Sequence, residues 1–241
     1  MRVLPRLAVT LLAAMLFVPM ATIGGLSAHA GDEPAATEIL AEASKRLAET
    51  KSVHFDLEIE GETFIDDNKT IQLLEAEGDL LRPDRVTTKF KAKLLGTATA
   101  TIELITIGEE SWTTNLLTGN WEPAPEEFGY DPSILFDGEE GLGPVMGKVT
   151  EANREDDDEI DDRDTYRVKA VVEQSVIEGL TAGTMKGSPV AVELWVDRET
   201  NDLLRAKLVE PESEGVENPA TWTLDISDHD RDVKIEAPEE G

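Results

Sequence analysis

The sequence predicts an α+β protein built on a highly curved antiparallel sheet, with helices against the concave face of that sheet. One stretch, residues 35–50, has apolar residues at helical spacing. Most of the remaining chain alternates apolar and polar residues with a period of two, which is typical of strands that bury one face. Because the strands come in runs and the helical stretches are segregated from them, the pattern favours α+β over α/β.

The first helix is expected at residues 35–50. Pro34 stands near its start, and Ile39, Leu40, Ala43 and Leu47 fall on one helical face. The period then changes to two, as apolar residues from Val53 to Ile59 alternate with polar ones. A helix therefore leads directly into a strand with one apolar face.

Short turns connect the strands that follow, so the first half reads as an antiparallel meander. Its further strands are expected at 70–81, 86–94, 97–107 and 111–115. In the second half, strands are expected at 149–154, 166–172, 190–196, 203–210 and 222–226, a helix at 174–185, and a brief last strand at 233–235.

Residues 117–147 differ from the rest because they are rich in glycine and proline. Two short helices are expected within them, at 132–136 and at 139–146. A long irregular segment in a folded domain is either a functional lid or an ordinary crossover that covers the sheet. Both readings stay open at this point.

The first thirty residues have the anatomy of a secretory signal peptide. Arg2 and Arg6 precede a short apolar run, and Ala28-His29-Ala30 is a small-x-small cleavage site. The apolar run is shorter than the ~20 residues that span a bilayer, although an uncleaved anchor is the alternative. We therefore expect cleavage after Ala30, an extracytoplasmic location, and a single domain at 31–241.

Composition narrows the classes of function. The formal net charge of −29 excludes non-specific nucleic-acid binding and opposes docking on anionic lipid headgroups. The chain has no cysteine, which removes disulfides, thiolate nucleophiles and cysteine zinc sites, together with the cysteine that anchors a bacterial lipoprotein.

Catalysis has little support in the sequence. Only His54 and His229 lie outside the predicted signal peptide, and both are expected at the surface. The chain has no nucleophile elbow, no zinc-protease helix, no phosphate-binding loop and no dinucleotide fingerprint. We therefore expect a protein that is not an enzyme and that uses no cofactor.

Two acidic runs are the candidates for a metal site. Residues 156–164 lack the glycine and spacing of a calcium loop, and the run from Asp228 to Glu239 has Val233 where such a loop needs glycine. Solvated turns, without a metal, are expected in both places. Weak calcium binding at 156–164 is the alternative.

Trp112, Trp121, Trp195 and Trp222 fall in or beside predicted strands. Aromatic residues in strands usually serve packing, which is the favoured interpretation here. The alternative is a hydrophobic rim for a ligand or partner, with Trp195 on the polar face of its strand.

The apolar face of the sheet carries the main hypothesis, because it needs a second layer. Residues of the middle segment are expected to supply that layer. Small residues such as Ala100 leave room that an acyl chain would fill, and a filled core is the alternative. The candidate lining residues are Phe55, Leu57, Ile59, Phe90, Leu94, Ala100, Ile102, Leu104, Leu135, Phe136, Leu142, Val145 and Met146.

Three stretches resemble the LppX/LprG family of envelope proteins, which has the LolA-like lipid-carrier fold. They are the helix-to-strand join at 47–55, the segment 108–123 with Pro132, and residues 192–200 together with the tail at 226–238. The similarity extends over nearly all of residues 31–241. The family's usual anchoring cysteine is missing, since Ala28-His29-Ala30 stands in its place.

The resemblance implies a half-barrel covered by helices, with an apolar cavity that carries acylated lipids or glycolipids across the cell envelope. It implies a lipid ligand, a membrane transporter or envelope protein as a further partner, and no catalytic residue. We expect a monomer. The competing hypothesis is an interaction or sensor module on the same fold, which docks a protein partner through Trp195 and the acidic surface.

Overall fold

Three helices and twelve strands form the part of the chain that the computed structural model describes, namely residues 33–64, 68–125, 134–135, 137–181, 183–213, 216 and 218–238. These elements belong to the unit Pro34–Gly241. The helices are α1 (Ala36–Glu49), α2 (Leu142–Met146) and α3 (Gln174–Ile177). The strands are β1 (Ser52–Glu60), β2 (Ile71–Leu81), β3 (Arg85–Leu94), β4 (Ala98–Ile107), β5 (Glu110–Thr114), β6 (Trp121–Pro123), β7 (Thr150–Arg154), β8 (Asp158–Ile160), β9 (Arg163–Val172), β10 (Val190–Asp197), β11 (Leu203–Val209) and β12 (Thr221–Ser227).

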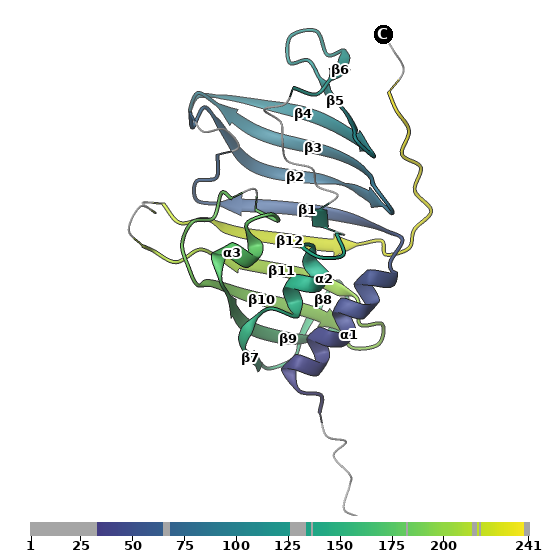
Figure 1. Ribbon diagram of the computed structural model, residues 1–241, viewed down its shortest axis with the longest axis vertical. Helices are drawn as coiled ribbons and strands as arrows, with labels where there is room; N and C mark the ends of the chain where they lie inside the picture. Colours follow the sequence, from purple (N-terminus) through teal and green to yellow (C-terminus); the bar gives the residue numbers. More distant parts are fainter. Residues whose placement is uncertain are drawn as a thin grey trace, which may run out of the picture. The chain divides into compact units, whose positions relative to one another are not determined.

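All twelve strands join one antiparallel sheet in the order β6-β5-β4-β3-β2-β1-β12-β11-β10-β9-β7, with β8 paired to β9. The first half of the chain runs outward from β1 as a meander, and the second half returns from β9 to β12. The first and last strands meet in the middle of the sheet, where Phe55 lies opposite Ile226 (Figure 1). The predicted antiparallel meander is therefore confirmed.

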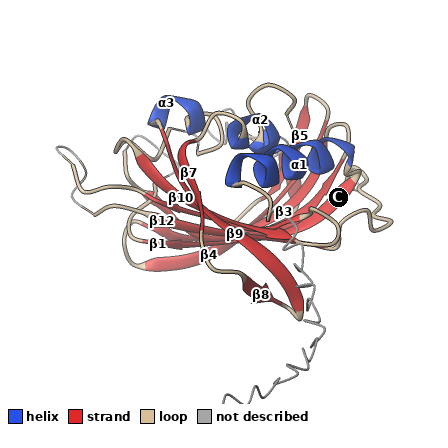
Figure 2. Cartoon of the chain, turned by 90° about the horizontal axis from the view of Figure 1, so that it is seen from below, coloured by secondary structure: helices blue, strands red, loops and turns tan. Residues whose placement is uncertain are grey.

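The helices lie on one side of the curled sheet (Figure 2), which confirms the predicted fold class. Helix α1 buries Ile39, Leu40, Ala43 and Leu47, the four residues whose spacing predicted it. It ends at Thr50, whose hydroxyl donates a hydrogen bond to the carbonyl oxygen of Arg46 over 3.0 Å. The apolar stripe of α1 and the apolar face of the sheet thus share one core.

The structure has two strands that the sequence did not predict, β6 and β8. Strands β6 and β8 have three residues each, which is too short to show a period of two. The strand expected at 233–235 is wrong, because this stretch pairs with none of the described strands. Both edges of strand β1 are already paired, with β2 and with β12, so the tail cannot add a strand there. Ile235 is buried as part of the tail, and its carbonyl oxygen accepts a hydrogen bond from the Arg85 side chain over 2.8 Å.

The predicted helices are shorter in the structure. Helix α2 occupies only the end of the stretch expected at 139–146, and α3 only the start of the stretch at 174–185. Gly183 adopts a φ of +64°, which an α-helix cannot continue through. Of the helix expected at 132–136, only residues 134–135 lie within the described part of the chain. Among the described helices, none has both the length and the apolar character needed to cross a bilayer.

Candidate functional site

The sheet register places every predicted strand residue of the candidate site on one face. Leu57 lies opposite Ala76, Ala76 opposite Phe90, and Phe90 opposite Ile102, which forms one apolar row across β1 to β4. The adjacent row contains Phe55, Gly78, Thr88 and Leu104. Since side chains alternate along a strand, these neighbours project to the same side of the sheet.

The same face continues across the other half of the sheet, where the helices cover it. Ile226, Leu224 and Trp222 of β12 lie opposite Phe55, Leu57 and Ile59. In Figure 1 the helices lie over the half formed by β7 to β12. Helices therefore cover one half of this apolar face, and no described helix covers the other half.

The middle segment supplies part of the second layer, as its apolar residues suggested. Leu142, Val145 and Met146 of α2 are buried, and α2 packs against α1. Leu135 is also buried, and all four belong to the core that includes Phe55 and Ile59. Phe136 lies outside the described residues.

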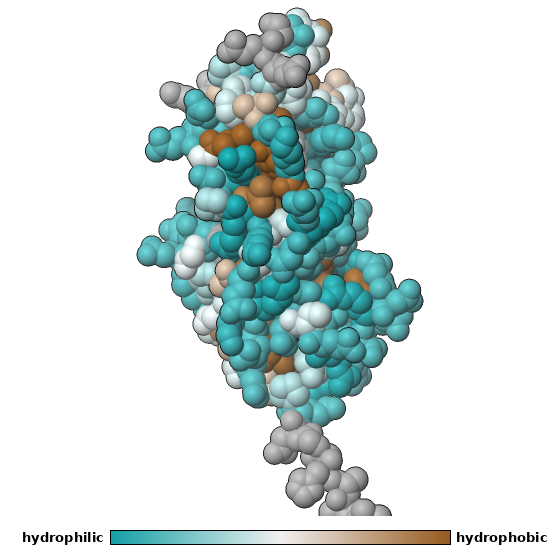
Figure 3. Space-filling view, turned by 90° about the vertical axis from the view of Figure 1, so that its right-hand side faces the viewer, coloured by the Kyte–Doolittle hydropathy of each residue, from teal (hydrophilic) through white to brown (hydrophobic). Residues whose placement is uncertain are grey.

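The half formed by β2 to β6 carries no described helix (Figure 1). On its apolar face, and on β1 beside it, the side chains of Leu57, Phe90, Leu94 and Ala100 are partly exposed, whereas Ile102 and Leu104 are buried. Figure 3 shows hydrophobic residues gathered at the height of β2 to β4 on a mostly hydrophilic surface. This part of the face offers apolar surface to a further group.

Two features give this part of the face an uneven floor. Gly78 lies beneath the ring of Phe55, and a Cβ atom added there would come within 2.9 Å of the Cζ atom of Phe55. Thr88 is buried, and its hydroxyl has no hydrogen-bond partner among the described residues. An unsatisfied buried hydroxyl costs about 1–3 kcal/mol, so Thr88 is a local cost to stability beneath this part of the face.

The opposite face of the same strands is charged and holds a hollow of about 540 Å³. Lys91 pairs with Glu75 across 2.9 Å and Lys89 with Glu77 across 3.8 Å on its floor. The remaining polar lining comes from Asp56, Glu58, Thr101, Thr223 and Asp225. Because its charges already neutralise one another in part, this hollow is less suited than the apolar face to an acyl chain.

Trp195 is not the exposed docking residue of the competing hypothesis. It lies on the charged face but is only 7% exposed, since its indole nitrogen donates to Asp158 of β8 over 3.0 Å. The guanidinium groups of Arg167 and Arg205 lie 5.5 and 5.9 Å from its ring. Trp195 therefore packs against its neighbours on the polar face of its strand, where the sequence pattern placed it. The hydrogen bond from its indole nitrogen is the main cause of the lowered pKa of Asp158.

The two histidines occupy different environments. His54 is partly exposed and contacts Asp79 at 2.9 Å. His229 is not the surface residue that its turn predicted, since its Nδ1 atom is buried without a partner among the described residues and its Nε2 atom lies 3.2 Å from the carbonyl oxygen of Leu203. Burial lowers the pKa of His229, although the nearby charge of Asp202 opposes this effect.

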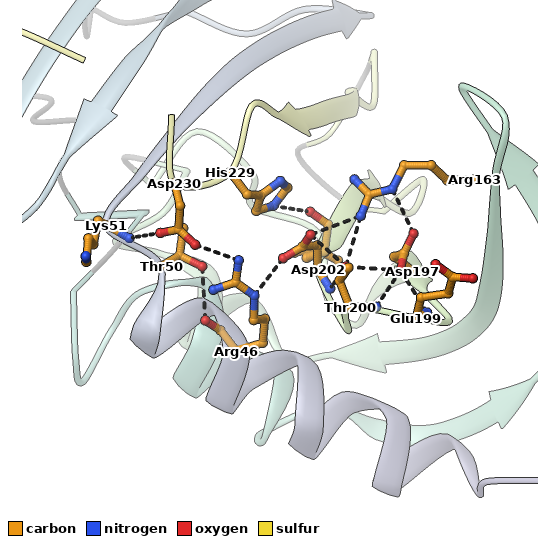
Figure 4. A network of polar contacts seen from close by, with 11 residues as sticks. Arg46, Thr50, Lys51, Arg163, Asp197, Glu199, Thr200, Asp202, His229 and Asp230 are labelled. Carbon is orange, nitrogen blue, oxygen red and sulfur yellow. Dashed lines mark hydrogen bonds and ion pairs between the residues drawn. The ribbon is translucent and has the colours of Figure 1, made fainter. Parts of the chain in front are cut away.

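A polar network that the sequence did not suggest joins α1, β9, the turn between β10 and β11, and the C-terminal tail (Figure 4). Asp202 pairs with Arg46 across 2.8 Å and with Arg163 across 3.0 Å. Arg46 also reaches Asp230 at 2.7 Å, and Arg163 reaches Asp197 at 2.7 Å. Because Arg46 and Asp230 are 184 residues apart, no local pattern could have identified the network.

The network carboxylates are held ionised. Burial acts to raise the pKa of Asp202, but hydrogen bonds from Thr200 and Arg163 outweigh it and lower that pKa below the usual range. The pKa of Asp230 is lowered by the backbone N–H of Lys51 and then by Arg46. These residues fix the end of α1 to the sheet and the tail.

Residues of both acidic runs form ion pairs with nearby arginines. Asp157 pairs with Arg154 and Arg198, and Asp228 pairs with Arg231 across 2.8 Å. Over the described part of the chain, no group of three or more histidine, aspartate or glutamate side chains is arranged to hold a metal ion.

Comparison with known proteins gives a consistent result. The LppX_LprAFG lipoprotein family matches residues 35–235. The lipoarabinomannan carrier protein LprG of Mycobacteroides abscessus is 23% identical over 205 residues, which are 85% of each chain.

Two solved structures share the fold. LprF from Mycobacterium bovis has a TM-score of 0.67 and 22% identity, over 84% of this chain and 96% of its own. The lipoprotein LppX of Mycobacterium tuberculosis has a TM-score of 0.57 and 16% identity, over 82% and 98% of the two chains. The resemblance noted in the sequence is thereby confirmed.

Proposed function

Because the chain belongs to the LppX_LprAFG lipoprotein family, we propose that it is an extracytoplasmic carrier of an acylated lipid or glycolipid. In this proposal the acyl chains lie on the apolar face of β1 to β4, and the protein catalyses no reaction. The signal-peptide pattern of the first thirty residues supports the location. The name of the relative LprG, a lipoarabinomannan carrier protein, supports the class of ligand.

One observation carries the proposal. Leu57, Phe90, Leu94 and Ala100 share a face and remain partly exposed, in the half of the sheet without a described helix. Burying a methylene group contributes about 0.8 kcal/mol, so twelve methylenes of an acyl chain would contribute roughly 10 kcal/mol before the costs of association. That is enough to hold a lipid and still release it to a membrane or a partner protein.

The proposed contacts also explain the composition of this face. Small residues at Ala98 and Ala100 leave room above this end of β4. In this proposal the partly exposed residues Leu57, Phe90, Leu94 and Ala100 meet the ligand. The buried residues of the predicted lining complete the layer beneath and opposite it, namely Phe55, Ile59, Ile102, Leu104, Leu135, Leu142, Val145 and Met146.

The test is mass spectrometry of lipids extracted from the protein after its purification, without detergent, from a bacterium that makes acylated glycolipids. We expect diacyl or triacyl lipid at a ratio near one per chain. A protein that carries no lipid, and that takes up none when lipid is added, would show that the apolar face is an ordinary core surface.

A matched pair of variants locates the ligand. Ala100 lies on the apolar face, and its neighbour Thr99 projects to the other side of β4, where it is exposed. Ala100→Trp should reduce bound lipid several-fold because the indole occupies the ligand's volume, whereas Thr99→Trp should leave it unchanged. Equal lipid in both variants would place the ligand elsewhere.

A further inference from the structure

Two hairpin tips expose leucine side chains to solvent. Among the described residues, four large hydrophobic side chains are exposed, and three of them lie in these tips. Leu95, in the turn between β3 and β4, is 74% exposed, while Leu116 and Leu117, in the loop between β5 and β6, are 51% and 96% exposed. Both tips lie toward the upper end of the sheet in Figure 1.

The tip segments of these two hairpins lack charge, and Lys93 and Lys69 adjoin the first of them. Residues 94–102 and 111–121 contain no aspartate, glutamate, lysine or arginine. Charged residues make up 30% of the chain, so twenty residues of average composition would carry about six. On a protein with a formal net charge of −29, the tips are therefore a distinct uncharged region.

Strand β4 connects the two tips. It pairs with β5 only from Leu104 to Ile107, so the stretch from Ala98 to Ile102 has β3 on one side and no described strand on the other. This stretch is also uncharged, and Ala98 is exposed. The two leucine tips and this strand end form one uncharged border of the sheet.

The fold gives no reason for a leucine at position 95. Leu95 and Gly96 have φ angles of +47° and +72°, a pair of left-handed residues for which Asn-Gly is the preferred sequence in a hairpin. A left-handed backbone costs a residue such as leucine about 1–2 kcal/mol. Because the side chain is mostly in water, burial does not offset this cost.

The second tip holds its leucine outward by hydrogen bonds. The side-chain oxygen of Asn115 accepts from the backbone N–H groups of Leu117 and Thr118 over 2.9 and 3.1 Å. The backbone N–H of Asn115 donates to the carbonyl oxygen of Asn120 over 2.8 Å and closes the loop. Trp121 lies partly exposed at the base of this tip. Tryptophan side chains are enriched where proteins meet the interface of a membrane.

We infer that the two tips dock the protein on a phospholipid bilayer by inserting Leu95 and Leu117 into its interface. Charge selects this occupant, because tips without carboxylates, with Lys69 and Lys93 beside the first of them, suit a largely neutral lipid surface. Such a contact also keeps the acidic remainder of the protein away from anionic headgroups. The inference rests on the proposed function in one respect: docking would bring the apolar face of the sheet close to the lipid that the protein collects.

The experiment measures binding of the full secreted chain to phosphatidylcholine vesicles by flotation. The variant carries Leu95→Asn and Leu117→Ser, and Val209→Thr is the control, since Val209 is the exposed hydrophobic residue outside the tips. Each lost leucine should weaken partition into vesicles about tenfold. The melting temperature of the double variant should not fall, because asparagine suits the left-handed position better than leucine.

Equal vesicle binding by wild type and double variant, or no binding by the wild type, would overturn the inference. Tighter binding to vesicles with added phosphatidylglycerol, weakened by salt, would indicate electrostatic docking and would also overturn it. The same holds if the wild type forms dimers that the substitutions dissociate, since the tips would then join two copies of the chain.

Lipid content separates this inference from the proposed function. A double variant that loses vesicle binding but still loads lipid from detergent solution would support docking by the tips. A wild type that binds vesicles through the leucines but never holds lipid would retain the docking inference and refute the carrier function.

Discussion

Replacing Asp202 by asparagine should destabilise the protein far more than replacing an exposed carboxylate. The Asp202 side chain is only 6% exposed and places one oxygen 2.8 Å from Arg46 and the other 3.0 Å from Arg163. An asparagine side chain at this position would keep the shape but lose the charge. Its amide nitrogen, a donor, would also face one of the two guanidinium groups, which are donors as well.

The expected magnitude follows from these contacts. Arg163 donates a hydrogen bond to Asp202, whereas Arg46 forms an ion pair with the other oxygen without a well-aligned hydrogen bond. A hydrogen bond to a charged group contributes about 1.5–3 kcal/mol and a neutral one about 0.5–1.5 kcal/mol, so the loss of charge toward both arginines is about 2–3 kcal/mol. Breaking a fully buried ion pair costs about 3–5 kcal/mol. The loss should stay below that figure, because Arg46 and Arg163 are 25% and 34% exposed and each keeps a second carboxylate.

Thermal unfolding measures this difference. For a domain of this size, a loss of 2–3 kcal/mol lowers the melting temperature by about 4–12 °C. Glu75→Gln is the control, since Glu75 pairs with Lys91 at a similar distance, 2.9 Å, but is 54% exposed. Such a surface pair contributes at most about 1 kcal/mol. Equal melting temperatures for the two variants would refute the assigned role of the network.

Acid should remove the difference between wild type and Asp202→Asn. The pKa of Asp202 is lowered in the folded protein, so its contribution is complete above the unfolded pKa of about 3.9 and is lost as pH falls through the folded value. The gap between the two proteins should stay constant from neutral pH to about pH 4 and then shrink. A gap that widens below pH 4 would contradict the sign of this pKa change.

Two further predictions concern Gly78 and His229, which are partly buried. Gly78→Ala should cost about 1–3 kcal/mol in chemical denaturation, because its Cβ atom would lie 2.0 Å from the carbonyl oxygen of Thr87, whereas Gly138→Ala, with open space at its Cβ position, should cost little. Similar losses in both would show that the strands shift apart without penalty. Burial lowers the pKa of His229, so wild-type stability should be complete above about pH 6.5 and should fall as pH drops below it. His229→Gln should flatten that part of the stability curve, and an unchanged slope would exclude His229 as its origin.

The elements of the candidate site were largely predictable because their signals are local. Alternation from Val53 to Ile59 identified β1 and the residues that share its apolar face, since the pleat makes the side-chain period a property of the strand itself. The spacing of Ile39, Leu40, Ala43 and Leu47 identified α1 for the same kind of reason. The family resemblance also lay in the sequence, in stretches distributed along the whole domain.

Other features depended on contacts between distant parts of the chain. The pairing of β1 with β12, the cover that β8 places over Trp195, and the ion pairs of Arg46 with Asp202 and Asp230 each join segments with no common local pattern. The exposed leucines are a similar case, because solvent exposure depends on which strands pair beyond a turn.

The sequence by itself therefore determined helix α1, most of the strands with their apolar faces, the lack of cysteine and the large negative charge. Only the tertiary structure decided which half of the apolar face the helices cover, which polar residues are buried, and where hydrophobic side chains reach solvent. The physical reason is that periodicity is set by backbone geometry within a few residues, whereas burial depends on everything that packs around a residue.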